Sequence, residues 1–293
     1  MLPRQSRYPY SPITERPDFT WPNGKRLAVY FVMGVEEYVF GEGMTEDLFA
    51  GASKPDFANT SWRDYGNRVG AIRLIDRFHR ENIPLSILLN TEVYDHAPQL
   101  MDHARRHGCE IIAHGLTNSD TLAGREPSDE AAYLAAVRDA IVAHEGKPPA
   151  GWASPWLAHT DNTPDLLAEA GYLYVIDLGM DDQPVWLRTR TEKLLSIPYA
   201  LELNDSSTII GRQSSPDDFY GMIADQFDEM LEASVEQPLV MPVVIHSFIS
   251  GQPFRLRGLR RALAHVLAQR DNIWLTTPDR IAAFVHQNPD VAI

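Results

Sequence analysis

Short apolar runs alternate with longer amphipathic segments along most of the chain. The run RLAVYFVM at 26–33 is typical of a buried strand, and residues 64–82 place apolar side chains on one helical face. The same alternation continues towards the C-terminus. It predicts further strands at 85–90, 109–114, 151–154, 172–177, 194–199, 239–246 and 272–276, and further helices at 97–108, 128–146, 163–171, about 217–233, 255–270 and 278–287.

These repeated units predict an α/β fold. Near-continuous apolar strands between amphipathic helices indicate a parallel sheet that helices cover. No linker or compositional break divides the chain, so a single domain at 26–293 is the simplest arrangement. The number of units favours a (β/α) barrel of roughly seven parallel strands over two open sheets. For the helix at 128–146, Ser128 is the expected N-cap and Gly146 the expected stop.

Residues 1–25 are expected to form an extended N-terminal arm. Prolines at positions 3, 9, 12, 17 and 22 exclude a regular helix there. The arm also carries aromatic side chains with which it could dock on the domain or on a neighbouring subunit. It lacks an apolar block long enough for a signal peptide or a membrane span, so a cytoplasmic location is expected.

Charge and cysteine content narrow the classes of partner. The formal net charge of −14 repels nucleic acid and anionic membranes, so neither is expected as a partner. Cys109 is the only cysteine, which excludes an internal disulfide and a cysteine-rich zinc site. The cysteine count points to a reducing compartment.

Polar residues follow many of the apolar runs. In a parallel barrel the carboxyl ends of the strands share one face, where active sites lie, so these residues are expected to converge there. Acids and histidines in such a place indicate hydrolytic or proton-transfer chemistry, either with or without a metal ion. The residues concerned are Glu36, Glu37, His114, Trp156, Asp177, Asp181, Asp182, Glu202, Asn204, Asp205 and His246.

Other histidines are assigned no role. His103 and His107 have the i,i+4 spacing of a helical metal site, but they lie among Asp102, Arg105 and Arg106 on a face predicted to be solvated.

The pair Glu36 and Glu37 could also belong to a solvated loop. Because the pair directly follows a buried strand, a functional interpretation is favoured.

Five of these strings resemble the motifs of one family. They are GVEEY at 34–38, HGLTN at 114–118, ASPW at 153–156, DLGMDDQPVW at 177–186 and VVIH at 243–246. In this order they resemble the NodB-homology polysaccharide deacetylases (carbohydrate esterase family 4). They are most similar to the cytoplasmic branch that includes the cofactor-independent allantoinases and peptidoglycan-deacetylase-like proteins. The resemblance covers roughly residues 21–284 and implies a distorted NodB-like barrel.

The resemblance also implies roles for individual residues. Glu36 would be the general base that activates water, and His246 the general acid that protonates the leaving nitrogen. Glu37 and His114 would occupy metal-ligand positions, giving a partial metal site. The substrate-binding set would comprise Asn118, Trp156, Asp181, Asp182, Glu202 and Asp205. A metal, or a backbone N–H near Trp156, would stabilise the oxyanion.

The third ligand position of the family's metal site holds Asn118 in place of a histidine. An amide oxygen is a weak zinc ligand compared with imidazole or carboxylate. The sequence therefore favours an enzyme without a cofactor, with a divalent metal such as zinc as the alternative.

Two functional hypotheses remain. The first is a hydrolase of non-peptide carbon–nitrogen bonds that acts on a small-molecule or short saccharide amide. The second is a degenerate barrel that binds a saccharide or small amide without turnover. Retention of both Glu36 and His246 favours the enzyme. A metal-dependent amidohydrolase barrel would need a His-x-His motif, which the sequence lacks. The relatives implied by the resemblance also suggest a homo-oligomer, such as a tetramer.

Overall fold

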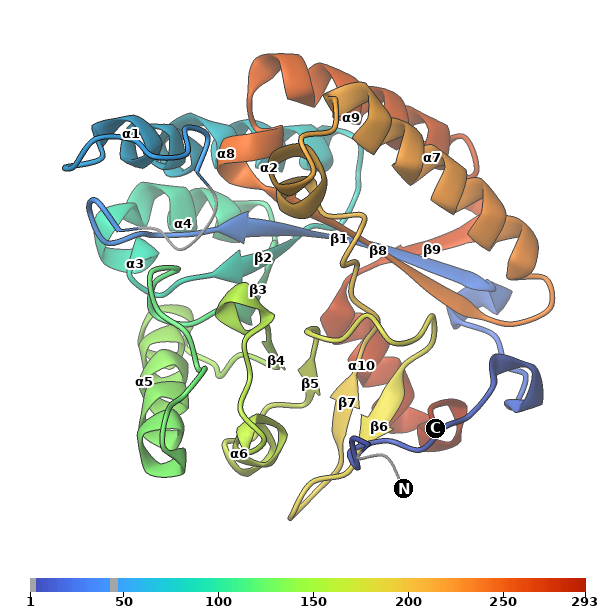
Figure 1. The fold of residues 1–293 in the computed structure, drawn as a ribbon. Helices are drawn as coiled ribbons and strands as arrows, with labels where there is room; N and C mark the ends of the chain where they lie inside the picture. The colour runs from blue at the N-terminus through green and yellow to red at the C-terminus, as the bar shows by residue number, and fades with distance from the viewer. Residues whose placement is uncertain (1–3, 43–46) are drawn as a thin grey trace.

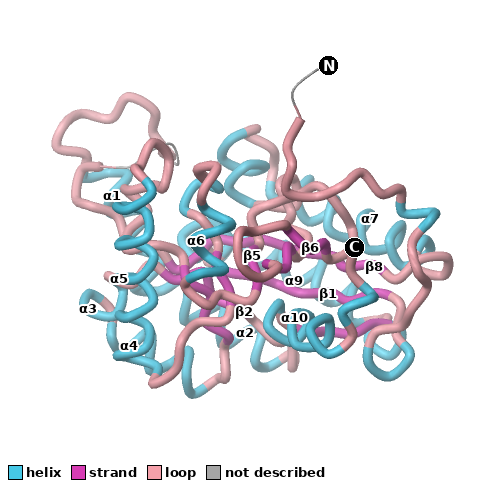
Figure 2. Tube along the Cα trace, turned by 90° about the horizontal axis from the view of Figure 1, so that it is seen from below, coloured by secondary structure: helices cyan, strands magenta, loops and turns pink. Residues whose placement is uncertain are grey.

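The computed structural model describes residues 4–42 and 47–293. Within these residues the strands form one curled sheet in the order β6-β7-β5-β4-β3-β2-β1-β8, and β9 pairs with β1 outside this sequence. Figure 2 shows the strands gathered in the centre with helices around them. The strands are β1 (Leu27–Val35), β2 (Ser86–Leu89), β3 (Glu110–Ala113), β4 (Gly151–Trp152), β5 (Tyr174–Val175), β6 (Val185–Leu187), β7 (Leu194–Ser196), β8 (Leu239–His246) and β9 (Ile273–Thr276).

Helices follow most strands and cover the outside of the curled sheet (Figure 1). Their apolar faces pack on the buried strands, as the helical periodicity predicts. They are α1 (Phe57–Tyr65), α2 (Ala71–Arg80), α3 (Val93–His96), α4 (Pro98–Arg106), α5 (Pro127–Glu145), α6 (Thr163–Glu169), α7 (Pro216–Ala233), α8 (Ser247–Ser250), α9 (Pro253–Leu267) and α10 (Pro278–Gln287).

The nine-residue strand β1 organises the sheet. Every residue of β1 is buried, and it pairs in parallel with β8 on one side and with β9 and then β2 on the other. In this register Gly34 lies opposite His246, and Val35 lies opposite Leu89. The residues that follow these strands therefore leave the sheet at the same edge.

The predicted α/β fold, a distorted barrel of mostly parallel strands, is confirmed, with two differences. First, residues 185–187 form β6, which was not predicted and runs antiparallel to β7. Second, the barrel is not fully closed, because the sheet ends at β6 and β8. Across this opening β8 forms an isolated bridge between Asn204 and Val244, and Val240 N–H donates to the Asp182 carbonyl. Pro242 has no N–H to donate and suits an edge strand such as β8.

Two predicted helix starts are wrong. The helix expected at 64–82 begins earlier, at Phe57, because Asp56 caps it by accepting a hydrogen bond from Asn59 N–H. A π-helical turn at Gly66–Gly70 then joins α1 to α2. Ser128 is not an N-cap, since α5 begins at Pro127, a residue suited to the first helical turn. Gly146 ends α5 as predicted, with a left-handed φ of 71°.

The N-terminal arm packs against the barrel within the same chain. Trp21 is only 1% exposed, and its indole N–H donates to the Leu239 carbonyl. Its ring packs against the rings of Trp274 and Phe284. Residues 1–3 of the predicted arm lie outside the described residues. The arm at Arg7 and the C-terminal Ile293 both lie beside β6, because Arg188 N–H donates to the Arg7 carbonyl and Trp186 N–H donates to the Ile293 carbonyl.

Among the described residues, no helix combines the length and the apolar character needed to cross a membrane.

Candidate active site

Three strands deliver the central side chains of the site. Glu36 follows β1, His114 follows β3, and His246 ends β8. β1 is parallel to β8, and β2 pairs in parallel with both β1 and β3. All three residues therefore reach the same edge of the sheet. The sequence predicted this convergence, and for these three residues it is confirmed.

Glu36 lies between the two imidazoles. Its Oε1 is 3.4 Å from His246 Nε2 and 3.8 Å from His114 Nε2. The three residues are only 5–6% exposed. This burial strengthens electrostatic interactions in the site.

Asp205 positions His246. Its Oδ1 lies 2.7 Å from His246 Nδ1, and its Oδ2 accepts hydrogen bonds from the His246 backbone N–H and the Ser250 hydroxyl. A proton on Nδ1 is therefore held by Asp205, and Nε2 faces Glu36. Asp205 is fully buried, so it supports His246 from behind and does not take the predicted substrate-contacting position.

His114 is held through its other nitrogen. His114 Nδ1 lies 2.8 Å from the Ala153 carbonyl, which accepts its proton. The Nε2 lone pair of the neutral imidazole then points towards Glu36. Burial lowers the pKa of His114, and this effect exceeds the opposite effect of the Glu36 charge. At neutral pH His114 can therefore accept a hydrogen bond through Nε2 at the site.

Glu36 remains ionised despite its burial. Burial alone would raise its pKa, but the neighbouring His246 and His114 and a hydrogen bond from Tyr38 together lower it below the usual 4.5. A carboxylate with a lowered pKa accepts protons throughout the neutral pH range. Glu36 therefore has the charge state that a general base requires.

Tyr38 is a site residue that the sequence analysis missed. Its hydroxyl donates to Glu36 Oε2 at 2.6 Å and accepts from Asn118 Nδ2 at 3.0 Å. Asn118 Oδ1 is buried and has no hydrogen-bond partner among the described residues. Asn118 thus supports Glu36 through Tyr38, and its free oxygen is available to a ligand. The only signal for Tyr38 in the sequence was its place two residues after Glu36.

Glu37 faces away from His114. Its Oε1 lies 3.2 Å from His96 Nδ1, and its Oε2 accepts from Asn67 Nδ2 at 3.2 Å. The carboxylate beside His114 is that of Glu36. The structure thus differs from the predicted pairing of Glu37 with His114, because consecutive residues of an extended chain point in opposite directions.

Asn90 and Gly34 allow the ends of the strands to lie close together. Asn90, fully buried after β2, accepts from Glu37 N–H at 2.9 Å and donates to the His114 carbonyl. A Cβ added to Gly34 would lie 2.7 Å from Glu36 Oε1 and 2.8 Å from a His246 ring carbon. Only glycine therefore allows Glu36 and His246 to approach each other at this position. Sequence reasoning missed both residues, since neither is titratable.

Trp156 lies on the loop after β4, beside Asn118. Its indole N–H donates to the Asn118 carbonyl at 2.9 Å. Trp156 and Leu157 both have left-handed backbones, with φ of 61° and 53°. Such backbones cost energy for residues other than glycine and are common at functional sites. Trp156 therefore lies beside Asn118, and its substrate-binding role stays a prediction.

A histidine–carboxylate pair lies beside this loop; its carboxylate, Asp177, was predicted at the strand ends, but its histidine, His159, was not. Asp177 Oδ2 lies 2.9 Å from His159 Nε2, and Asp177 Oδ1 accepts from Ser154 N–H at 2.7 Å. Burial lowers the pKa of His159, but the Asp177 charge and hydrogen bond outweigh burial and raise it overall. This pair connects the loop after β4 to the end of β5.

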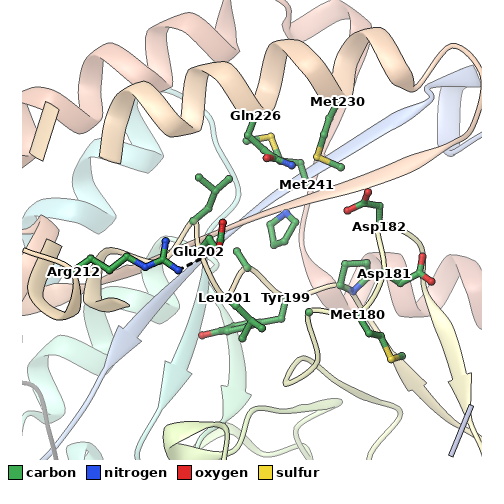
Figure 3. A pocket seen from close by; sticks show the side chains of 15 residues that line it. Met180, Asp181, Asp182, Tyr199, Leu201, Glu202, Arg212, Gln226, Met230 and Met241 are labelled. Carbon is green, nitrogen blue, oxygen red and sulfur yellow. Dashed lines mark hydrogen bonds and ion pairs between the residues drawn. The ribbon is translucent and has the colours of Figure 1, made fainter. Parts of the chain in front are cut away.

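Three predicted substrate-binding acids lie elsewhere. Asp181, Asp182 and Glu202 line a cavity of about 620 Å³ beneath α7, at the opening between β8 and the β5–β7 side (Figure 3). Asp181 forms an ion pair with Arg16 at 2.6 Å, and Glu202 faces Arg212 at 3.1 Å. Pro242 lines this cavity four residues before His246, which places the two about 13 Å apart along β8. Because these three acids follow strands in the sequence, they were predicted at the active site; the sequence did not show that they line a separate cavity.

The three metal-ligand positions that the resemblance implies do not form a zinc site. Zinc sites in proteins use imidazole, thiolate or carboxylate ligands that converge on one point. Glu37 is turned towards His96, and Asn118 offers only an amide oxygen, so His114 alone keeps its expected place. The acid that lies between two imidazoles is Glu36, with His114 on one side and His246, held by Asp205, on the other.

Comparisons with known proteins give relatives of one kind. A family model described as polysaccharide deacetylase matches residues 64–175. A Schizosaccharomyces pombe protein classed as a polysaccharide deacetylase is 25% identical over 89% of this chain and 91% of its own. The Helicobacter pylori peptidoglycan deacetylase is 23% identical over 82% of this chain and 92% of its own.

A solved structure agrees with these relatives. The PuuE allantoinase has a TM-score of 0.84 and 25% identity, and the match covers 96% of this chain and 98% of that chain. The resemblance predicted from the five motifs is confirmed. The predicted enzyme class also agrees, because these relatives and neighbours are named as deacetylases and an allantoinase, which hydrolyse non-peptide carbon–nitrogen bonds.

Proposed function

Because the chain is a relative of the polysaccharide deacetylases, we propose that it hydrolyses a non-peptide amide bond with Glu36 as base and His246 as acid. The observation that carries this proposal is the 3.4 Å contact between Glu36 Oε1 and His246 Nε2. It places an acid and a base in contact at the strand ends, where both can reach one bound amide. The alternative, a barrel that binds without turnover, has no need for that pair.

Glu36 and His114 are arranged to hold the attacking water. Their facing atoms are 3.8 Å apart, which is too far for a hydrogen bond but suits one water molecule in contact with both. Glu36 would remove a proton from this water as it attacks the carbonyl carbon. His114, neutral at pH 7, would orient the water through its Nε2 lone pair.

His246 would complete the reaction. As an imidazolium it donates Nδ1–H to Asp205 and presents Nε2–H to the leaving nitrogen. The Asp205 carboxylate stabilises the charged ring, as in other histidine–carboxylate pairs of hydrolases. A backbone N–H of the loop that carries Trp156 would stabilise the oxyanion. This scheme uses no metal ion.

The burial of the reacting groups bears on the substrate class. The reacting groups are 5–6% exposed, so a slender amide such as an acetamido group or a ureide suits the site better than a folded peptide. Asn118 Oδ1, buried and unpartnered among the described residues, is positioned to accept a hydrogen bond from an amide N–H. We propose a small-molecule or short saccharide amide as substrate.

A panel of amides tests this function. Allantoin, other ureides and N-acetylglucosamine oligomers would be assayed with untreated and with chelator-treated protein. We expect one class to be hydrolysed and the rate to survive chelation. Binding of a panel member without any turnover would favour the alternative of a ligand-binding barrel. Activity that chelation abolishes and zinc restores would contradict the metal-free scheme.

We further propose a cytoplasmic homo-oligomer, for which a tetramer is one arrangement. Several large apolar side chains are exposed, among them Phe40, Phe49 and Phe57, and the Phe40 and Phe57 rings lie 5.1 Å apart. Such patches are typical of subunit interfaces. Light scattering at micromolar concentration would give a multiple of 33.0 kDa. The mass of one chain would refute the proposal.

A further inference from the structure

A histidine–aspartate cluster lies between α2 and α4, outside the site described above. We propose that Asp76, His103 and His107 bind a divalent cation of the zinc type. One ligand atom from each residue lies within 4.8 Å of the others. Asp76 Oδ1 is 2.9 Å from His103 Nε2 and 3.8 Å from His107 Nε2. Two tetrahedral ligands of zinc lie about 3.4 Å apart, so small side-chain shifts would bring the three atoms into place.

The helices determine this geometry. His103 and His107 are four residues apart at the end of α4, so their side chains share one face. Asp76 faces them from α2, which packs beside α4. Two ligands four residues apart on one helix and a third on a neighbouring helix form a common arrangement for a metal in a helical frame. The protein backbone would not need to move.

The Nε2 atom of His107 is placed to bind the cation. It lies 3.8 Å from Asp76 Oδ1, beyond hydrogen-bond distance, so no direct bond to Asp76 has to be broken. With the cation on Nε2 the proton of the neutral ring lies on Nδ1, which is buried and has no hydrogen-bond partner among the described residues. Asp76 would balance part of the cation's charge.

Water would take the fourth position on the ion. His79 lies one turn after Asp76 on α2 with its ring centroid 4.3 Å from that of His107, but it is not one of the three residues whose ligand atoms lie within 4.8 Å of one another. The protein ligands are then two imidazoles and one carboxylate, ligand types that zinc prefers over all-oxygen sets.

Two arginines near the cluster oppose the ion. Arg80 lies 3.8 Å from Asp76 Oδ2, and Arg106 Nη2 lies 3.4 Å from His103 Nδ1. Both side chains are exposed and can turn into solvent. Their charge would weaken cation binding without blocking it, so removal of the Arg106 charge should tighten it.

The cluster lies on the side of the barrel opposite to Glu36. It is formed by the last turns of α2 and α4, which precede the amino ends of β2 and β3. Glu36 and His114 lie beyond the carboxyl ends of the same sheet. A cation here would join two helices and stabilise the fold, and it would not take part in hydrolysis.

Zinc titration of chelator-stripped full-length protein tests the site. We expect one equivalent of Zn²⁺ to bind by calorimetry and to raise Tm. His103→Asn and His107→Asn should each weaken binding at least tenfold, and Arg106→Gln should tighten it. His265→Asn is the matched control, because His265 forms a single 2.7 Å pair with Asp228 between two other helices. The control should bind zinc as the unmodified protein does.

Three results would overturn the inference. They are no binding by the unmodified protein, binding unchanged in His103→Asn, and binding lost in His114→Asn but kept in His103→Asn. The last result would place the ion at the strand ends. Circular dichroism of each variant would show that it is folded, so that a loss of binding is not a loss of structure. The test does not depend on turnover, so it stands apart from the proposed hydrolysis.

Discussion

At the scale of single residues, the site is organised around the charge of Glu36. Two imidazoles and the Tyr38 hydroxyl surround its carboxylate, and their combined effect keeps the pKa below 4.5 despite burial. The Tyr38 hydroxyl also accepts a hydrogen bond from Asn118 Nδ2, which holds that hydroxyl beside Glu36. The acid limb of the pH–rate profile should therefore report the pKa of Glu36 and the groups that lower it.

Tyr38→Phe should move that acid limb to higher pH. The base acts when ionised, so the rate falls as pH drops through the pKa of Glu36. Loss of the Tyr38 hydrogen bond raises that pKa, and the rate is then lost at a less acidic pH. Phenylalanine keeps the ring that stacks beneath Arg63. The measurement is kcat/KM against pH, and an unchanged or more acidic limb would contradict the assignment.

At the scale of elements, strand order brings distant residues together, and this part could be predicted. The apolar runs that end at Glu36, His114 and His246 indicated parallel strands with a common edge. Which of two adjacent glutamates faces inward could not be predicted, since a one-residue change reverses the side. The pairing of Asp205 with His246 could not be predicted either, because the position of Asp205 depends on a loop that crosses the barrel opening.

Gly34→Ala tests how closely β1 and β8 must approach. The new methyl group would lie within 2.8 Å of Glu36 and His246, so one of them must move. We expect kcat to fall tenfold or more, since small displacements of catalytic groups are costly. Gly221→Ala is the matched control in α7, where a Cβ meets no atom within 4 Å. That variant should keep its activity and gain about 0.5–1 kcal/mol in stability. Equal kcat in both variants would contradict this account.

At the scale of the whole molecule, the arm and the barrel form one packed unit. The arm's aromatic side chains indicated docking, but its target could not be predicted. The structure buries Trp21 against β8, β9 and α10 of the same chain. The cavity at the barrel opening was equally unforeseen, because it arises where the sheet fails to close.

Trp21→Ala should lower the free energy of unfolding by about 3–5 kcal/mol, the usual cost of removing a large buried aromatic side chain. Tyr10→Ala provides the comparison within the same arm, since Tyr10 is 88% exposed and its loss should cost under about 0.5 kcal/mol. Urea unfolding followed by tryptophan fluorescence and circular dichroism measures both. Similar small effects in the two variants would show that the arm adds little to stability.

The pair Glu36→Gln and Glu37→Gln tests the central claim most directly, because the two residues are neighbours with the same side chain. Steady-state kcat on the hydrolysed amide is the measurement. Loss of the proton acceptor in Glu36→Gln should lower kcat about a hundredfold or more. Glu37 faces His96 and Asn67, so Glu37→Gln should lower kcat by less than about tenfold. A full rate in Glu36→Gln, or a larger loss in Glu37→Gln, would contradict Glu36 as the base.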